Sequence, residues 1–229
     1  EALAFNPDLR VAAARVEQAA AYVRLSGATL YPQVNLSATG SLGADSSGVQ
    51  GVGPAALSVE GVMRYMARKS GNDEEKWGII GLIHDLDYEM YPDQHCTMTK
   101  KILEDNGWPP EYIRAVLSHG WGLASDIEPL TKLEKTLYAM DELTGLVTTS
   151  ALVRPSRSVM DMEVKSVKNK WKDKRFAAGV DRSVIEKGAA MLGVSLEDLI
   201  SDCIKGMREV AEDIGLAGSS PGHSPSPES

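Results

Sequence analysis

Apolar residues recur at intervals of three and four positions along most of this chain, which is the spacing of one face of an α-helix. The pattern is nearly continuous over residues 51–216. Two helix-start signals divide this pattern: Thr131 with Glu134, and Ser195 with Asp198, each have the spacing of a capping box. The pattern therefore predicts an all-α domain, in which the segment KWGIIGLI is a buried helix.

The start of the chain follows a different pattern. Residues 1–30 are rich in alanine, with Asn6 suited to an N-cap and Pro7 to the first helical turn, and they predict one long helix. Pro32 ends this helix, and the alternating segment QVNLSATGSL that follows has the period of a β-strand. A helical appendage thus precedes the all-α domain.

Two polar segments mark the limits of that domain. The stretch LGADSSGVQGVGP lacks a periodic apolar face and predicts a flexible linker. Residues 217–229 are rich in serine and proline, cannot bury enough apolar area to fold, and predict a disordered tail. We therefore divide the chain into an appendage with its linker over residues 1–50, a helical domain over residues 51–216, and the tail.

Composition restricts the classes of partner. The 24 basic and 32 acidic residues give a formal net charge of -8, which argues against general binding of nucleic acid or of an anionic membrane. No apolar run approaches the roughly 20 residues of a transmembrane helix. The two cysteines, Cys96 and Cys203, form no CxxC motif, which favours neither a disulfide framework nor a cysteine-only zinc site. A reducing, cytoplasmic location fits these features.

The stretch LIHDLDYEMYPDQH holds two of the four histidines. His84 and Asp85 follow the buried helix, and a buried charged pair needs compensation, which a divalent metal commonly supplies. His95 begins the next predicted helix, His119 ends the following one, and Asp141 lies against an apolar face of a fourth. Singly, each residue is explained by a helix cap, a core histidine or a hydrogen-bonded structural carboxylate. Together they indicate a metal site.

Two more carboxylates lie close to this set. Asp87 and Glu89 are within about one turn of Asp85, and either is a candidate to orient a water or to act as a general acid or base. A solvated helix end is the alternative explanation for both.

Four basic residues are candidates to bind a phosphate group. The run VKSVKNKWKDKRF contains Lys168 and Lys172 and has a density of lysine suited to a phosphate-rich ligand, although a solvated basic face is the simpler explanation. Arg154 and Lys132 are weaker candidates for the same role.

The motifs LIHDLDYE, PDQH, LSHG and YAMDELTG resemble those of the HD-domain superfamily of metal-dependent phosphohydrolases. The later segments ALVRPS and VKSVKNKWKDKRFAAGV resemble one bacterial branch of it, and the resemblance covers residues 52–216. It implies an all-α helical bundle whose His and Asp side chains bind one or two divalent ions, drawn from Mn, Fe, Co, Mg and Zn. The implied activity is hydrolysis of a phosphoester by a water that the metal activates.

The resemblance also implies roles for individual residues. By this resemblance His84 and Asp85 would be metal ligands, with Asp85 in the catalytic group. Asp141 would be the final ligand of the first ion. Where a second ion is bound, His95 and His119 would hold it and Asp85 would bridge the two. The implied partners are a small phosphorylated substrate or nucleotide and, in a homodimer, a second copy of the chain.

One family residue is missing. Members carry a further histidine in the first helix, shortly before an apolar-Val-Glu run, and the matching stretch GPAALSVEGVMRYM has Ala55 instead. Pro54 is unsuited to a helix interior and indicates that this helix is shortened. His84, Asp85 and Asp141 then remain for the first ion. The alternative function is a degenerate HD domain that binds a metal or nucleotide, or mediates association, without catalysis.

Residues 1–40 resemble a fragment of an outer-membrane efflux channel protein. In that family a segment like NPDLR opens a helix and a segment like YPQVNLSATG enters the barrel. One helix and one strand cannot form a channel, because such a barrel needs many strands to close. We therefore expect this part to be an appendage and not a channel.

Overall fold

The described part of the chain is built from helices. The computed structural model describes residues 53–88 and 91–218, and within them eight α-helices and two 3₁₀ turns occur without any β-strand. The all-α fold is thus confirmed for these residues. In chain order the elements are α3 (Pro54–Lys69), α4 (Glu74–Ile83), η1 (Pro92–Gln94), α5 (Thr97–Asp105), α6 (Pro110–Leu117), η2 (Ser118–Gly120), α7 (Lys132–Leu152), α8 (Val164–Trp171), α9 (Arg182–Leu192) and α10 (Leu196–Glu209).

Several predictions concern other residues. The long helix and the strand predicted before residue 40, and the linker up to residue 52, lie outside the described residues. So do Glu89 and the tail from residue 219 onwards.

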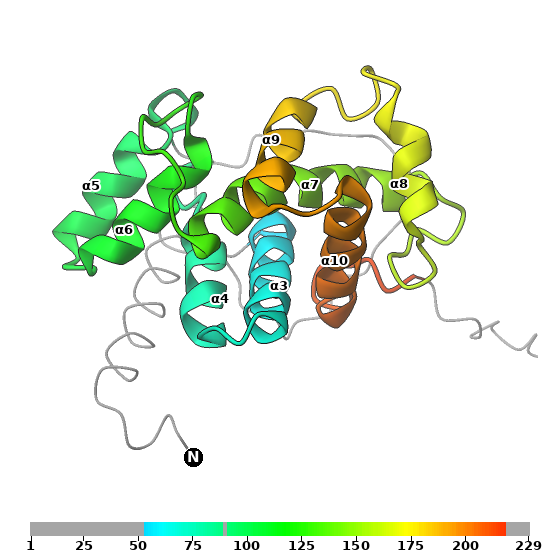
Figure 1. Cartoon of the computed structure of the whole chain (residues 1–229), viewed down its shortest axis with the longest axis horizontal. Helices are drawn as coiled ribbons and strands as arrows, with labels where there is room; N and C mark the ends of the chain where they lie inside the picture. Colours follow the sequence, from blue (N-terminus) through cyan, green and yellow to red (C-terminus); the bar gives the residue numbers. More distant parts are fainter. Residues whose placement is uncertain (1–52, 89–90, 219–229) are drawn as a thin grey trace, which may run out of the picture.

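The longest helix, α7, is the central element of the bundle. It packs against α3, α8, α9 and α10, and Figure 1 shows it running lengthwise, with α5 and α6 near one end and α8 near the other. The predicted capping box fixes its start: the hydroxyl of Thr131 accepts the N–H of Glu134 at 3.2 Å, and the Glu134 carboxylate accepts the N–H of Thr131 at 2.9 Å. This well-capped helix holds Asp141 near its middle.

Two hydrophobic cores share α3. Val62 belongs to a core formed chiefly with α7, α9 and α10, whereas the next residue, Met63, belongs to a core formed with α4 and α6. Successive helical side chains point about 100° apart, so one helix serves both cores. Trp77 and Ile80 of α4 lie in the second core, which confirms that KWGIIGLI is a buried helix.

A glycine allows α10 to approach α3 closely. A Cβ atom placed on Gly206 would lie 2.6 Å from the Cα atom of Val62, far inside van der Waals contact. Because the obstructing atom is backbone, no side-chain rotation would relieve the clash. The absence of a side chain at residue 206 therefore sets the distance between the two helices.

The ends of the described segments refine the predicted boundaries. Helix α3 begins at Pro54, so this proline occupies the first turn, where its missing N–H is tolerated. Ala217 was assigned to the disordered tail, but its carbonyl accepts the hydroxyl of Ser158 at 2.9 Å. The tail was placed too early there, because composition does not register a single pairing of this kind.

Among the residues that the structure describes, no helix has the length and apolar character needed to cross a bilayer.

Candidate metal centre

The five residues predicted to bind metal meet at one place, although they come from separate elements. His84 caps the C-terminus of α4, and Asp85 follows it. His95 follows η1, His119 lies within η2, and Asp141 belongs to α7. Each histidine stands where a helix ends or the chain turns, and the three rings gather around Asp85.

Asp85 lies between two groups of ligand atoms. Its Oδ2 atom is 3.4 Å from Nε2 of His84, which is itself 3.2 Å from Oδ1 of Asp141. Its Oδ1 atom is 3.5 Å from Nε2 of His95 and 3.3 Å from Nε2 of His119. One carboxylate therefore faces both groups, which is the arrangement of a bridging ligand.

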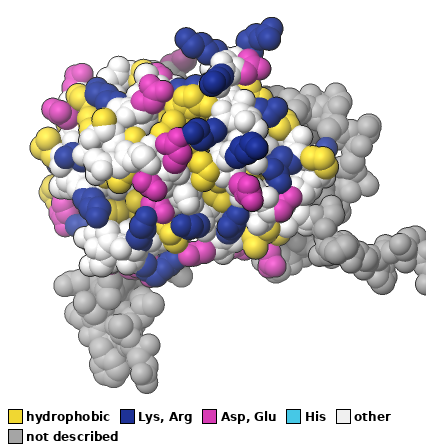
Figure 2. All heavy atoms as spheres, turned by 45° about the vertical axis from the view of Figure 1, so that its right-hand side comes forward, with side chains coloured by type: hydrophobic (Ala, Val, Ile, Leu, Met, Phe, Trp, Pro, Cys, Tyr) yellow, Lys and Arg dark blue, Asp and Glu magenta, His cyan; other side chains and the backbone are white. Residues whose placement is uncertain are grey.

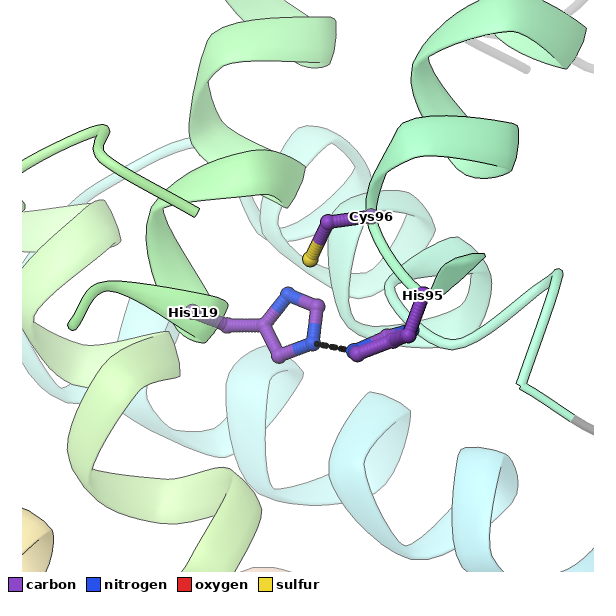
Figure 3. A group of neighbouring side chains, drawn as sticks. All are labelled: His95, Cys96 and His119. Atoms are coloured by element: carbon purple, nitrogen blue, oxygen red, sulfur yellow. Dashed lines mark hydrogen bonds between the residues drawn. The ribbon is translucent and has the colours of Figure 1, made fainter. Parts of the chain in front are cut away.

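The Nε2 atoms of His95 and His119 form a nearly equilateral triangle with Oδ1 of Asp85. The Nε2 atoms of His95 and His119 are 3.0 Å apart, and each is within 3.5 Å of Oδ1 of Asp85. Ligands bound at about 2.0 Å in a tetrahedron lie about 3.3 Å from one another. Two imidazole lone pairs repel each other, so the short contact drawn in Figure 3 requires a proton or a cation between the rings. The distance of 3.0 Å fits either a shared proton or a bound cation.

In each of the three histidines, hydrogen bonds hold Nδ1, the ring nitrogen on the other side from Nε2. The Nδ1–H groups of His84 and His119 donate to backbone carbonyls of α4 and α6, at 2.7 Å and 2.5 Å. His95 donates from Nδ1 to Oδ1 of Asp87 at 2.7 Å. These bonds fix the ring orientations and leave Nε2 of each histidine available to a metal, as is usual for metal-bound histidines.

The carboxylates of the site favour positive charge beside them. Burial acts to lower the pKa of His84, but the charges of Asp85 and Asp141 outweigh it and raise this pKa well above its usual value. Burial acts to lower the pKa of His95 as well, and the hydrogen bond to Asp87 helps to raise it to about 10. Burial acts to raise the pKa of Asp85, yet the neighbouring imidazoles hold it well below its usual range. A bound cation can supply the positive charge that these protons otherwise provide.

A cavity of about 280 Å³ opens beside His84, Asp85 and Asp141. Its walls come from the start of α3, from α7 and from the segment after α10, and they include Ala55 and Thr144. Ala55 therefore shares a cavity with the three residues predicted to bind the first ion. This agrees with the predicted placement of the first helix.

Asp87 is fully buried and does not line this cavity. Both of its oxygens are in use, because Oδ1 accepts from His95 and Oδ2 accepts the N–H of Thr99 at 2.7 Å. These contacts favour a positioning role, holding His95 against the start of α5, over the predicted role in acid–base chemistry. For Glu89, which lies outside the described residues, that role stays a prediction.

The four basic residues predicted to bind phosphate do not line the cavity. Arg154 pairs with Asp161 at 2.8 Å, and Lys168 pairs with a glutamate of α10. Lys132 and Lys172 are exposed. Figure 2, which turns the α8 side towards the viewer, shows basic side chains interspersed with acidic ones. This face therefore carries no unbroken basic surface, and the ion pair of Lys168 joins the lysine-rich run to α10.

Cys96 lies in this centre and was not predicted there. Its sulfur and one ring nitrogen from each of His95 and His119 lie within 4.8 Å of one another. A search for paired cysteines passes over it, because a single cysteine matches no common zinc spacing. Its position directly after His95 is the one signal in the sequence that pointed to this place.

Comparison with known proteins bears on the start of the chain. A family model described as outer membrane efflux protein matches residues 1–61. This confirms the resemblance found in residues 1–40 and extends it into the first half of α3. No curated protein and no solved structure matches the chain. The resemblance of residues 52–216 to the HD-domain superfamily stays a prediction.

Proposed function

We propose that this chain is a metal-dependent phosphohydrolase of the HD-domain type, which binds two divalent ions around Asp85 and hydrolyses a small phosphoester. The geometry of Asp85 is the observation that carries this proposal, since one of its oxygens faces the Nε2 atom of His84 and the other faces those of His95 and His119. A carboxylate that only forms a structural salt bridge needs one histidine nitrogen beside it. Two converging groups, each with its histidine rings anchored at Nδ1, are typical of a dinuclear metal centre.

The residues of the chain hold and orient the ions in this proposal. His84, Asp85 and Asp141 hold one ion, and His95 and His119 hold the other together with the second oxygen of Asp85. Hydrogen bonds at Nδ1 keep the rings in place, so little rearrangement is needed on binding. When bound, the ions supply the chemistry by lowering the pKa of a water and by offsetting negative charge on the phosphoryl group.

The cavity limits the size of the substrate. Its volume of about 280 Å³ lies just below the usual range of about 300–1,000 Å³ for ligand pockets and suits a compact ester or a small nucleotide. Among the described residues its lining includes the hydroxyl-bearing Thr144 and Thr148 and no lysine or arginine. The hydroxyl of Thr144 already donates to the carbonyl of Asp141 at 2.8 Å and can only accept from a substrate, so Thr148 is the candidate donor to its polar part. The charge of the phosphate is left to the metal ions. A small phosphorylated substrate or a nucleotide fits both features.

One observation favours a second function. Ala55 stands in the cavity beside His84 and Asp141, where the family resemblance calls for a histidine. With one imidazole fewer, the first ion has three protein ligands, which is enough for binding but weakens it. A degenerate domain that binds a metal or nucleotide without catalysis is therefore the alternative.

Metal analysis combined with an activity screen separates these functions. The full-length chain would be loaded with manganese, magnesium, cobalt, iron or zinc and tested on phosphomonoesters, nucleotides and cyclic dinucleotides. We expect about two ions per chain and hydrolysis of at least one ester, with both lost in Asp85→Asn. Bound metal without hydrolysis of any ester would support the degenerate domain, and a chain that binds none of the ions would overturn the proposal.

A further inference from the structure

Cys96 is buried beside two of the residues that we assign to the second ion. Its exposed fraction is 2%, and its sulfur lies within 4.8 Å of a ring nitrogen of His95 and of one of His119. Figure 3 shows the three side chains pointing towards one another from the start of α5 and the end of α6. The cluster therefore contains two nitrogen donors and one sulfur donor in one small volume.

Two local features bring the sulfur to this place. Cys96 has a φ angle of 66°, in the left-handed region, so consecutive residues His95 and Cys96 both direct their side chains towards His119. Gly120 makes room on the other side, because a Cβ atom there would lie 2.7 Å from the sulfur. Any side chain at residue 120 would displace the sulfur from its place beside His119.

A cation between the two histidines would relieve the repulsion of their facing lone pairs, as a shared proton does without one. Their Nε2 atoms are 3.0 Å apart and share Oδ1 of Asp85 as a neighbour. Zinc bonds to nitrogen and sulfur are about 2.0–2.3 Å long, which places neighbouring donors on one tetrahedral ion about 3.3–3.6 Å apart. The sulfur, within 4.8 Å of a nitrogen of each ring, would reach such a position by side-chain rotation. Two imidazoles, a carboxylate and a thiolate form a donor set that tetrahedral zinc prefers.

We propose that the thiolate of Cys96 is a further ligand of the second ion, together with His95 and His119, and that it makes this position selective for zinc. The inference rests on the proposed function, since it names the metal preference of one half of that centre. On binding, the thiol releases its proton to solvent as the sulfur–metal bond forms. The other position, with one imidazole and two carboxylates from His84, Asp85 and Asp141, has the harder donor set that suits manganese, iron or magnesium.

Cobalt is a spectroscopic substitute for zinc and provides the test. The metal-free full chain would be titrated with cobalt while absorption is recorded in the near ultraviolet, where a thiolate bound to cobalt gives an intense charge-transfer band. The sequence has two cysteines, so Cys96→Ser and Cys203→Ser form a matched pair. Cys203 is the control, because it is equally buried but packs in the α10 core against Met207.

We expect the band in the parent chain and in Cys203→Ser, and its absence in Cys96→Ser. Zinc affinity should fall at least about 10-fold to 100-fold in Cys96→Ser, while manganese binding at the His84 position stays unchanged. The spectrum of Cys203→Ser decides the matter even if Cys96→Ser fails to fold, because Cys96 is then the one cysteine left to give the band. Bound cobalt without a thiolate band, or failure to bind cobalt and zinc while manganese binds, would overturn the role of Cys96 and leave the proposed function standing, whereas failure to bind any of the five metals would overturn both.

Discussion

Asp85 faces both groups of ligand atoms, whereas Asp141 belongs to the group of His84, and this difference predicts unequal losses. Asparagine keeps the shape of either side chain but removes its charge. We expect Asp85→Asn to lose both ions and Asp141→Asn to retain about one ion per chain. Metal content measured by elemental analysis, with helicity checked by circular dichroism, provides the readout.

Asp161→Asn is the matched control for these two substitutions. Asp161 is an exposed carboxylate that pairs with Arg154 and does not line the cavity. Its loss should leave metal content unchanged. If Asp85→Asn and Asp141→Asn both kept the full metal content of the parent chain, neither carboxylate would be a ligand.

Substitution of Asp87 should change metal affinity differently from substitution of Asp85 or Asp141, because Asp87 contacts His95 and would act on the metal through it. Asparagine at residue 87 can accept only one of the two hydrogen bonds that the carboxylate now accepts. We expect the affinity for the second ion to fall about 10-fold to 100-fold, with the ion at His84 retained and a loss of about 1–3 kcal/mol in the free energy of unfolding. Competition titration with a chromophoric chelator would resolve the two ions. Equal weakening of both would contradict a role specific to His95.

Single residues differ in how far the sequence reveals their roles. His84, His95, His119 and Asp141 could be predicted, because their types, their order and their positions at helix ends all pointed to one site. Cys96 could not, because its left-handed φ angle follows from how the chain turns between η1 and α5 and has no sequence signal of its own. The phosphate-binding role of the basic residues stays a prediction; Arg154 and Lys168 pair with acidic side chains, which is a property of the folded chain that the sequence does not reveal.

At the scale of the element, the start of α3 determines how complete the first ligand group is. The helix begins at Pro54, and Ala55 lines the cavity with His84 and Asp141. Replacing Ala55 by histidine and Pro54 by alanine should extend the helix backwards and add one imidazole ligand. We expect the affinity for the first ion to rise at least about 10-fold, together with the melting temperature in the presence of manganese.

A histidine one position further along gives the matched control. Ala56 does not line the cavity, so Ala56→His with Pro54→Ala adds an imidazole at the same helix end without adding a ligand. Metal affinity should stay at the parent value in this variant. An equal gain from both double variants, or from neither, would show that Ala55 does not face His84.

The crossing of α3 and α10 predicts a change in stability that is independent of metal. A Cβ atom at Gly206 would clash with the backbone of Val62, so Gly206→Ala should lower the free energy of unfolding by about 1–3 kcal/mol. At Gly145 of α7 the nearest atom to a new Cβ is 3.5 Å away. Gly145→Ala should therefore be neutral or stabilising by up to about 1 kcal/mol. Denaturant titration of both variants, with chelator present, measures their free energies of unfolding. An unchanged free energy of unfolding in Gly206→Ala would mean that α3 and α10 can move apart at little cost.

Helices themselves were predictable where capping and periodicity agreed, as for α7 and α10, both of which begin at the predicted N-caps Thr131 and Ser195. The exact first residues of the helices near the site were not predictable. His95 was expected to head a helix, but α5 begins at Thr97 after the left-handed turn at Cys96. The sulfur that follows this turn packs where Gly120 has no side chain, which is a contact distant in sequence.

At the scale of the whole molecule, the efflux-family match and the packing place the domain boundary differently. The match runs through residue 61, into α3, whereas the two described cores draw on buried residues from Val59 onwards. If packing defines the folding unit, a chain starting at Gly51 should keep the cooperative melt and metal content of the full chain. Thermal melting followed by circular dichroism, with elemental analysis of the same sample, checks both properties.

A chain starting at Val62 supplies the opposite comparison, because it removes all of the residues that the efflux-family model matches. It loses the first half of α3, including Val59, which is 1% exposed, and the part of α3 that lines the cavity. Removing Val59 alone costs about 1.5–3 kcal/mol of apolar burial, which is a large share of the stability of a domain this size. We therefore expect this chain to melt at a lower temperature or without cooperativity. If instead the chain starting at Gly51 is insoluble or molten, residues before 51 pack on the domain, and the appendage is part of the folding unit and not a separate segment.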